Sequence, residues 1–163
     1  MTIRIRAAKA VDDAAIAAIL LPVFQAGETN AIERDVDAAG ALAYWCDPLH
    51  AVFVVEDADG VLLGTSYLRA NQRGGGSHVA NAGYVTAEAA RGRGVARAMA
   101  EHSFDAARAG GFTAMQFNIV VSTNTRAVAL WQALGFAIVG RVPGAFRHPT
   151  LGAVDTLVMH RTL

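Results

Sequence analysis

The stretch Arg91-Gly92-Arg93-Gly94-Val95-Ala96 follows a strand-like run, residues 79–86, and opens a long helical pattern, residues 95–109. The first N–H groups of a helix have no partner inside the helix, and the helix dipole adds partial positive charge there. Gly92 and Gly94 lack the Cβ atoms that would keep a phosphate away from the backbone, and the two arginines can add charge-assisted bonds. The hexamer therefore predicts an anion site suited to a pyrophosphate, the alternative being a glycine-rich turn with two solvated arginines.

Length and composition are those of one compact unit. With 163 residues, 53% of them apolar, the chain can bury a sizeable core, and we expect a single domain over residues 1–163. Fourteen basic and fourteen acidic side chains give a formal net charge of zero, which argues against a nucleic-acid or acidic membrane partner. Thirteen of the basic residues are arginines and alanine is abundant, which indicates a GC-rich bacterial genome.

Cysteine content and hydropathy predict a soluble cytoplasmic protein. Cys46 is the single cysteine, so no intrachain disulfide can form, and no Cys/His spacing is typical of a metal site. Residues 1–6 alternate polar and apolar side chains, unlike a signal peptide, and no apolar run approaches membrane-spanning length. We therefore expect no membrane partner and no bound metal.

Period-two and β-branched patterns predict seven strands. Two of them form a hairpin around a turn at residues 57–60, which implies antiparallel pairing. The glycine-rich segment 71–77 and the segment 142–152, which contains two prolines, are predicted to be loops. The predicted strands are residues 3–7, 50–56, 61–68, 79–86, 114–121, 137–141 and 153–161.

Four helices are predicted between these strands. The first begins at Asp12 or Asp13, the second covers residues 33–45 and the third covers residues 95–109. The fourth is predicted to start at a Ser122 or Thr123 cap and to end at Gly135. This order predicts a mixed α/β sheet with a strand–helix–strand unit around the glycine hexamer.

Two motifs in this frame resemble those of a known family. Residues 85–96 resemble the acetyl-CoA signature of the GCN5-related N-acetyltransferase (GNAT) superfamily, in which Gln or Arg, two residues, Gly, one residue, and Gly or Ala follow one another. Arg91, Gly94 and Ala96 match that pattern. About thirty residues later, residues 124–136 look like the family's second signature, an Asn-led helix that ends in Leu-Gly-Phe.

The resemblance implies a fold, a co-substrate and a reaction. The fold would be α/β (α+β), with a mixed, mostly antiparallel seven-stranded sheet, about four helices, and splayed central strands 79–86 and 114–121. Acetyl-CoA would lie in the splay, with its pantetheine arm along Val85, its diphosphate on residues 91–96, and Asn124 and Trp131 beside it. The acceptor amine would attack the thioester directly, without a covalent enzyme intermediate or a metal.

The proton-transfer groups are less well defined by the sequence. Trp131 stands where many family members carry a Tyr as general acid, and an indole N–H is not a useful acid near neutral pH. The alternative role for Trp131 is a core anchor, and Cys46 is expected to be a buried small hydrophobe rather than a nucleophile. The candidates for the base are Tyr84, Glu88, His78, His148, and a water relayed by Asn118.

Two asparagines and one loop are candidates for holding the acceptor. Asn81 and Asn118 are expected to point into the cleft, either to orient the acceptor or to satisfy the splayed backbone. Residues 117–131 and 81–85 also resemble a subgroup of yeast acetyltransferases that act on proline-analogue imino acids, in which asparagines hold the amino acid. In the loop 142–152, Arg147 could clamp a carboxylate beside His148, or could simply be solvated.

These features predict transfer of an acetyl group from acetyl-CoA to a primary or secondary amine of a small molecule, possibly an amino or imino acid. Asn118, Asn81 and Tyr84 are the predicted catalytic residues. Two alternatives stay open at this point, a protein or peptide N-acetyltransferase and a non-catalytic CoA-binding module. A homodimer is expected to be possible, because family members are often dimers.

Overall fold

A computed structural model describes residues 2–163 and contains a seven-stranded sheet in the order β1-β2-β3-β4-β5-β7-β6. Its strands are β1 (Ile3–Ala7), β2 (Ala51–Asp57), β3 (Leu62–Ala70), β4 (Val79–Thr86), β5 (Ala114–Val121), β6 (Ala137–His148) and β7 (Gly152–Thr162). The α-helices of this described part are α1 (Asp13–Ala26), α2 (Ala38–Trp45), α3 (Val95–Ala109) and α4 (Thr125–Ala133). The expected mixed sheet with four helices is therefore confirmed.

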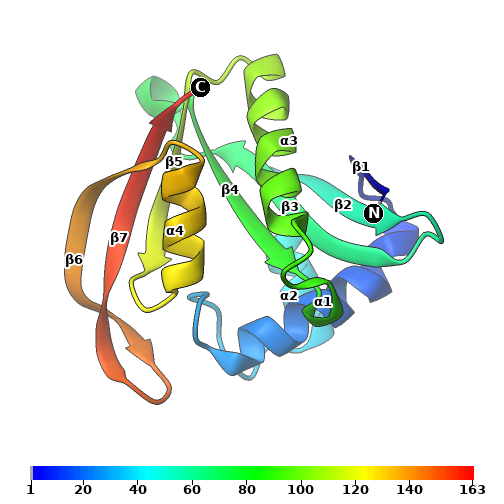
Figure 1. The fold of residues 1–163 in the computed structure, drawn as a ribbon, viewed down its shortest axis with the longest axis horizontal. Helices are drawn as coiled ribbons and strands as arrows, with labels where there is room; N and C mark the ends of the chain where they lie inside the picture. Colours follow the sequence, from blue (N-terminus) through cyan, green and yellow to red (C-terminus); the bar gives the residue numbers. More distant parts are fainter. Residues whose placement is uncertain (1) are drawn as a thin grey trace.

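The centre of the sheet is open. β4 and β5 are parallel and pair only at Val79 with Ala114 and at Ala80 with Met115, whereas the other neighbouring strands are antiparallel. Beyond Ala80 the two strands diverge toward their carboxyl ends, where α3 and α4 begin (Figure 1). The predicted splay of strands 79–86 and 114–121 is confirmed, and it leaves main-chain groups without sheet partners beside the starts of two helices.

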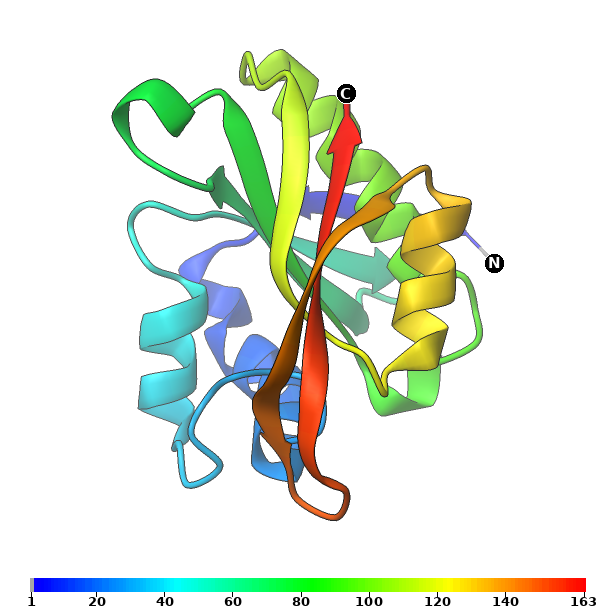
Figure 2. The same ribbon diagram turned by 90° about the vertical axis from the view of Figure 1, so that its left-hand side faces the viewer.

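Helices cover both faces of the sheet, α1 and α2 on one side and α3 and α4 on the other (Figure 2). The side of α1 and α2 encloses a cluster that includes Leu20, Trp45 and Tyr67. The side of α3 and α4 encloses a second cluster that includes Phe104 and Trp131. Burial of these two apolar clusters fixes the helices on the sheet and holds the open centre between them.

The β1–α1 junction is held by charged groups. The Arg6 guanidinium donates Nη1 and Nη2 to the two carboxylate oxygens of Asp12, at 2.7 and 2.9 Å, and its Nε to Glu56 at 2.9 Å. The Lys9 N–H also donates to Asp12, at 2.8 Å. Asp12 is 6% exposed, and these donors lower its pKa to about 2, with the Arg6 hydrogen bond as the largest cause.

Two predicted helix starts were wrong, because a polar side chain further along caps each helix. α2 begins at Ala38, not at residue 33, because the Asp37 carboxylate accepts from the Gly40 N–H at 2.8 Å. α4 is capped by Asn124, whose Oδ1 accepts from the Ala127 N–H at 3.3 Å, and not by the serine or threonine before it.

The predicted loop 142–152 was also wrong. β6 runs on to His148 and pairs with β7 down to Gly152, so that only a short turn separates the strands. Pro143 is accommodated because β6 is the last strand of the sheet and its register shifts between Val142 and Phe146. An edge strand can lose one N–H donor at such a bulge without breaking the ladder.

No helix in the described residues is long and apolar enough to cross a membrane.

Candidate active site

A cleft of about 330 Å³ occupies the splay between β4 and β5. Its walls come from both faces of the sheet, since Tyr67 belongs to the cluster beside α1 and α2 whereas Trp131 belongs to the cluster beside α3 and α4. The cleft therefore passes through the plane of the sheet. The lining residues are Thr29, Asn30, Ala31, Ile32, Tyr44, Tyr67, Arg69, Asn81, Ala82, Gly83, Tyr84, Phe117, Asn118, Ile119, Val120, Asn124, Ala127 and Trp131.

Tyr67 forms the aromatic wall on the α2 side. Its ring stacks on His50, with centroids 4.2 Å apart and planes 9° apart, and meets the Trp45 ring edge-on at 4.8 Å. Its hydroxyl lies 3.4 Å from that of Tyr44. Gly83 lies beneath the ring, and a Cβ built there would fall 2.8 Å from Tyr67 Cζ. The position needs glycine because any side chain would displace the tyrosine.

Four amide side chains span the start of the splay. The Asn81 Nδ2 donates to the main-chain oxygen of Gln116 at 2.9 Å, across the gap that opens after Ala80. The Asn118 Nδ2 donates to Asn71 Oδ1 at 2.7 Å, and its Oδ1 accepts from Gln116 Nε2 at 3.0 Å. Asn81 and Asn118 both line the cleft, and the Asn81 amide occupies a main-chain acceptor that the splay leaves without a strand partner, whereas Asn118 bonds to side chains.

Tyr84 and Trp131 form the opposite wall. Their rings lie 5.1 Å apart, and Phe117 packs against the indole at 5.0 Å. The Tyr84 hydroxyl turns away to α3, 2.6 Å from Ser103 Oγ, and burial raises its pKa. Ser103 Oγ also donates to the Ala100 carbonyl at 2.7 Å, and the Tyr84 hydroxyl also donates to Met115 Sδ at 3.7 Å. The hydroxyl is therefore neutral near pH 7 and engaged in the core.

The glycine turn leads directly into α3. Gly92 and Gly94 have φ angles of 76° and 81°, and no atom lies within 4 Å of a Cβ built on either. Gly94 is the N-cap of α3 and provides no side-chain cap, so the first-turn N–H groups have no partner inside the helix. Val95 is buried under the turn and Ala96 is half-buried, while Arg91 is exposed. The geometry is that of an open main-chain anion cradle.

Val85 ends the wall nearest this turn. Its side chain is 3% exposed and packs in the cluster with Trp45 and Tyr67, on the α2 side of β4. Its main chain continues the strand edge that faces the splay. The residue therefore lies between the cleft-lining part of β4 and the glycine turn, and its contact with the pantetheine arm stays a prediction.

Several candidates from the sequence lie elsewhere. Arg147 is exposed on β6, and His148 Nδ1 accepts from the Thr150 and Leu151 N–H groups in the β6–β7 turn. Neither lines the cleft. Glu88 and His78 are exposed at opposite ends of β4 and also lie outside the lining.

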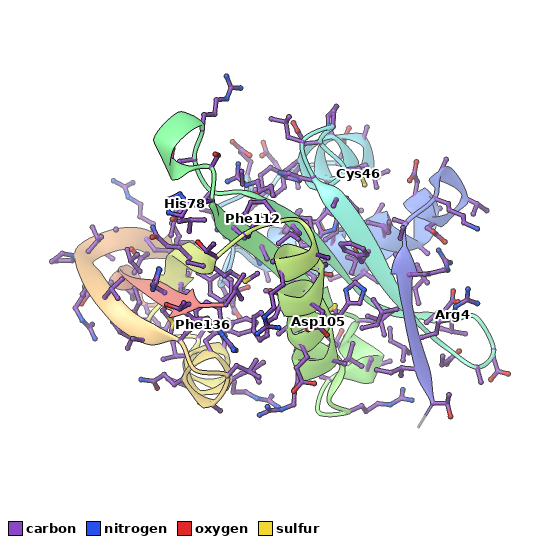
Figure 3. The ribbon with its side chains drawn as sticks, turned by 90° about the horizontal axis from the view of Figure 1, so that it is seen from above. Arg4, Cys46, His78, Asp105, Phe112 and Phe136 are labelled. Carbon is purple, nitrogen blue, oxygen red and sulfur yellow. The ribbon has the colours of Figure 1, made fainter. Side chains whose placement is uncertain are left out.

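Cys46 is also outside the cleft. It is half-buried at the end of α2 and packs with the α1–α2 cluster, and burial raises the pKa of its thiol. Figure 3 shows it on the far side of the sheet from Asp105 of α3. In the described residues, no group of three or more His, Cys, Asp or Glu side chains is arranged to hold a metal ion.

The sequence did not indicate that Arg69, Tyr44, Tyr67 and residues 29–32 line the cleft. Tyr67 and Arg69 are two positions apart in β3 and so lie on the same face, and Arg69 pairs with Asn81 of β4. The hairpin pattern predicted the strand but not which of its faces reaches the splay. An arginine at the end of an otherwise uncharged strand was the available signal.

Comparisons with known proteins agree with this architecture. The chain matches the model of the Acetyltransferase (GNAT) family over residues 15–136. It is 34% identical over 86 residues to N-acetyltransferase aca1 of Schizosaccharomyces pombe, which is 53% of this chain and 41% of that protein. The match thus spans less than half the length of the curated relative, and the expected likeness to a yeast acetyltransferase is distant and partial.

Solved structures share the fold over nearly the whole chain. A GCN5-related N-acetyltransferase from Kribbella flavida superposes with a TM-score of 0.94 at 44% identity, over 99% of this chain and 98% of that chain. The acetyltransferase yncA of Salmonella typhimurium, solved with its cofactor acetyl-CoA, superposes with a TM-score of 0.86 at 24% identity, over 100% of this chain and 95% of that chain. The resemblance expected from the two motifs is confirmed, and the chain belongs to the GNAT acetyltransferase family.

Proposed function

We propose that the protein transfers the acetyl group of acetyl-CoA to a primary or secondary amine of a small molecule, in particular an amino or imino acid. The observation that carries the proposal is the cleft in the splay of β4 and β5, together with the glycine turn that follows the carboxyl end of β4 and begins α3. A long, amide-rich thioester with a diphosphate needs both features together, a strand edge for its arm and an anion cradle for its phosphates.

The residues present fit acetyl-CoA. Residues 91–96 would hold the diphosphate on main-chain N–H groups, because Gly92 and Gly94 leave the approach free of Cβ atoms. The edge of β4 near Val85 would accept the pantetheine amides, and Asn124 and Trp131 would border the arm from α4. When bound, acetyl-CoA supplies an acyl group activated as a thioester. This family's relatives solved with acetyl-CoA, from Salmonella typhimurium and Sinorhizobium meliloti, support the choice of co-substrate.

The chain's own residues orient the acceptor rather than take its proton. Among the described residues that line the cleft, none is Asp, Glu or His. The Tyr84 hydroxyl is engaged with Ser103, and burial raises the pKa of Tyr67 as well. The amine therefore enters the site in its neutral form, and the proton that it loses on attacking the thioester passes to water or to the departing thiolate of CoA. Trp131 acts as an aromatic wall and not as the acid.

The two alternatives lack a structural feature in their favour. A basic peptide acceptor would need an acidic groove, and the described lining carries no carboxylate. A non-catalytic CoA-binding module would not need the part of the cleft on the α2 side of the sheet, which Tyr44 and Tyr67 line.

Release of free thiol from acetyl-CoA, measured with a panel of amino acids, polyamines and aminoglycosides, tests the proposal. Turnover with small amines supports it. Binding of acetyl-CoA without turnover on any amine would identify a binding module, and turnover on peptides alone would identify a protein acetyltransferase.

We further propose that residues 1–163 act as one catalytic domain in the cytoplasm, as the lone cysteine suggests. A homodimer stays a prediction, which sedimentation of the purified protein would decide.

A further inference from the structure

We propose that Arg69 recognises a carboxylate on the acceptor, so that the enzyme selects amines that carry an acid group. This inference rests on the proposed function and narrows it to one class of substrate. It also moves the carboxylate site from Arg147, which lies on β6 outside the cleft, to the end of β3.

Arg69 is the one charged side chain among the described residues that line the cleft. The ion pairs of the described residues join other arginines to carboxylates, and none of them involves Arg69. The residue is half-buried, so its charge is only partly compensated by water. A half-buried guanidinium in a cleft that holds no carboxylate is a site for an anion that arrives with a ligand.

The neighbouring amides orient the guanidinium without neutralising it. Asn81 Oδ1 lies 3.5 Å from Arg69 Nε, a long contact, while its Nδ2 is engaged with the Gln116 carbonyl. In the described part of the chain, no hydrogen bond uses Arg69 Nη1 or Nη2. Those two nitrogens form the end of the fork that binds a carboxylate with two parallel hydrogen bonds.

Asn118 is less suited to the same task, because its amide carries no charge. Its amide nitrogen donates to Asn71 at 2.7 Å, and its amide oxygen accepts from Gln116 at 3.0 Å. Both ends of the Asn118 amide are therefore engaged with the protein, so that recognition of an anion passes to the arginine. The asparagines build the frame and Arg69 provides the charge.

The other walls suit a small acceptor. Tyr44 and Tyr67 contribute hydroxyls 3.4 Å apart, and burial raises the pKa of Tyr67, so the Tyr67 hydroxyl is neutral at physiological pH. A polyamine or an aminoglycoside would bring several positive charges next to Arg69 with no carboxylate to balance them. An amino or imino acid brings one carboxylate for Arg69 and one amine for acetylation.

The test compares each acid with the same amine lacking the acid. The acceptors are L-proline, prolinamide and pyrrolidine, and L-methionine and methioninamide, each at saturating acetyl-CoA. The wild-type enzyme should acetylate an acid with a kcat/KM about 10 to 100 times that of its amide, the range expected for a charge-assisted bidentate contact. Arg69→Gln should raise the KM for the acid by about the same factor. It should leave the kcat/KM for the amide, the KM for acetyl-CoA and the melting temperature unchanged.

Three further variants complete the design. Arg73→Gln alters an exposed arginine in the loop after β3 and should leave every constant unchanged. Arg69→Lys keeps the charge but loses the forked guanidinium. Its KM for the acid should therefore lie between those of the wild type and Arg69→Gln. If Arg147→Gln lowers kcat/KM for the acids and Arg69→Gln does not, the inference is overturned.

The outcomes separate this inference from the proposed function. Equal wild-type rates with acids and amides, or an Arg69→Gln effect that is the same for both, overturn the role of Arg69 while leaving a small-amine acetyltransferase in place. Absence of turnover with every amine of the wider panel overturns the proposed function itself, and the Arg69 inference with it. A fall in melting temperature with Arg69→Gln, accompanied by a higher KM for acetyl-CoA, indicates a structural role and also overturns the inference.

Discussion

The hydroxyl of Tyr84 lies 2.6 Å from that of Ser103 and points to α3, on the side of β4 away from Tyr67 and α2. Ser103 Oγ donates a hydrogen bond to the Ala100 carbonyl, so the two hydroxyls and the helix form one chain of hydrogen bonds. A tyrosine that the sequence offers as a catalytic group thus contributes its ring to the cleft and its polar end to the core.

Tyr84→Phe should therefore leave turnover within about threefold of wild type and leave the pH profile unchanged, because burial already keeps the hydroxyl protonated. It should lower the free energy of unfolding by roughly 1 kcal/mol, as expected for one neutral hydrogen bond. Steady-state kinetics from pH 6 to 9 and urea unfolding measure the two effects. Ser103→Ala is the control for the lost hydrogen bond, and a hundredfold fall in kcat in Tyr84→Phe alone would make Tyr84 the base.

Gly94→Glu should abolish the rise in melting temperature that acetyl-CoA produces. The substitution places a negative charge at the start of α3, in the anion cradle, and strains a backbone with a φ of 81°. Gly60→Glu is the matched control, since Gly60 has a φ of 80°, equally open surroundings and a position in the β2–β3 turn. An intact acetyl-CoA shift in Gly94→Glu, with the same base stability as the control, excludes the glycine turn as the diphosphate site.

Gly83→Ala should weaken acceptor binding and the fold together. The added methyl group meets the Tyr67 ring, which His50 and Trp45 hold from two other directions, so the ring cannot move freely. Overpacking of this kind costs roughly 1–3 kcal/mol. Gly140→Ala, where the nearest atom lies 3.7 Å from the new Cβ, should be tolerated. Thermal unfolding of both variants measures the difference in stability. Equal melting temperatures would show that the Tyr67 ring does not need the space that Gly83 leaves beneath it.

The stability contributed by Asp12 should vanish in acid. The Arg6 hydrogen bonds lower its pKa in the folded protein to about 2 from the ordinary 3.8, so the contribution is complete above pH 3.8 and disappears as the pH falls toward 2. Asp12→Asn should cost roughly 1–2 kcal/mol at pH 7, with the difference from wild type shrinking between pH 4 and 2.

The measurement for Asp12 is urea unfolding at a series of pH values. Asp59→Asn, in the exposed turn after β2, is the matched control and should change stability little at any pH. A constant difference in stability between wild type and Asp12→Asn down to pH 2 would show that the contribution does not depend on the charge of the Asp12 carboxylate.

Much of the fold could be predicted from the sequence, because its periodic patterns are local. The alternation along 114–121 and the glycine hexamer at 91–96 located one half of the splay and the start of α3 to the residue. The errors arose where a local signal met a competing contact. Two prolines predicted a loop after residue 141, but pairing with β7 outweighs them on an edge strand.

The candidate site was predicted on one side only. Motif residues located the glycine turn and the helix α4, although the cap of α4 was misplaced, and their contacts with acetyl-CoA stay a prediction. The acceptor side depends on which strand face reaches the splay, and that is set by the pairing of Arg69 with Asn81 in three dimensions. Arg147 has the same chemistry as Arg69, and only the fold distinguishes them.

The cleft that passes through the plane of the sheet also bears on the order in which ligands bind. The proposed site for acetyl-CoA lies toward α3 and α4 and the proposed site for the acceptor lies toward Tyr44 and Tyr67, so both ligands can occupy the cleft at once. Neither has to leave before the other enters. Initial-velocity plots against one substrate at fixed levels of the other should therefore intersect, and each product should be able to depart first.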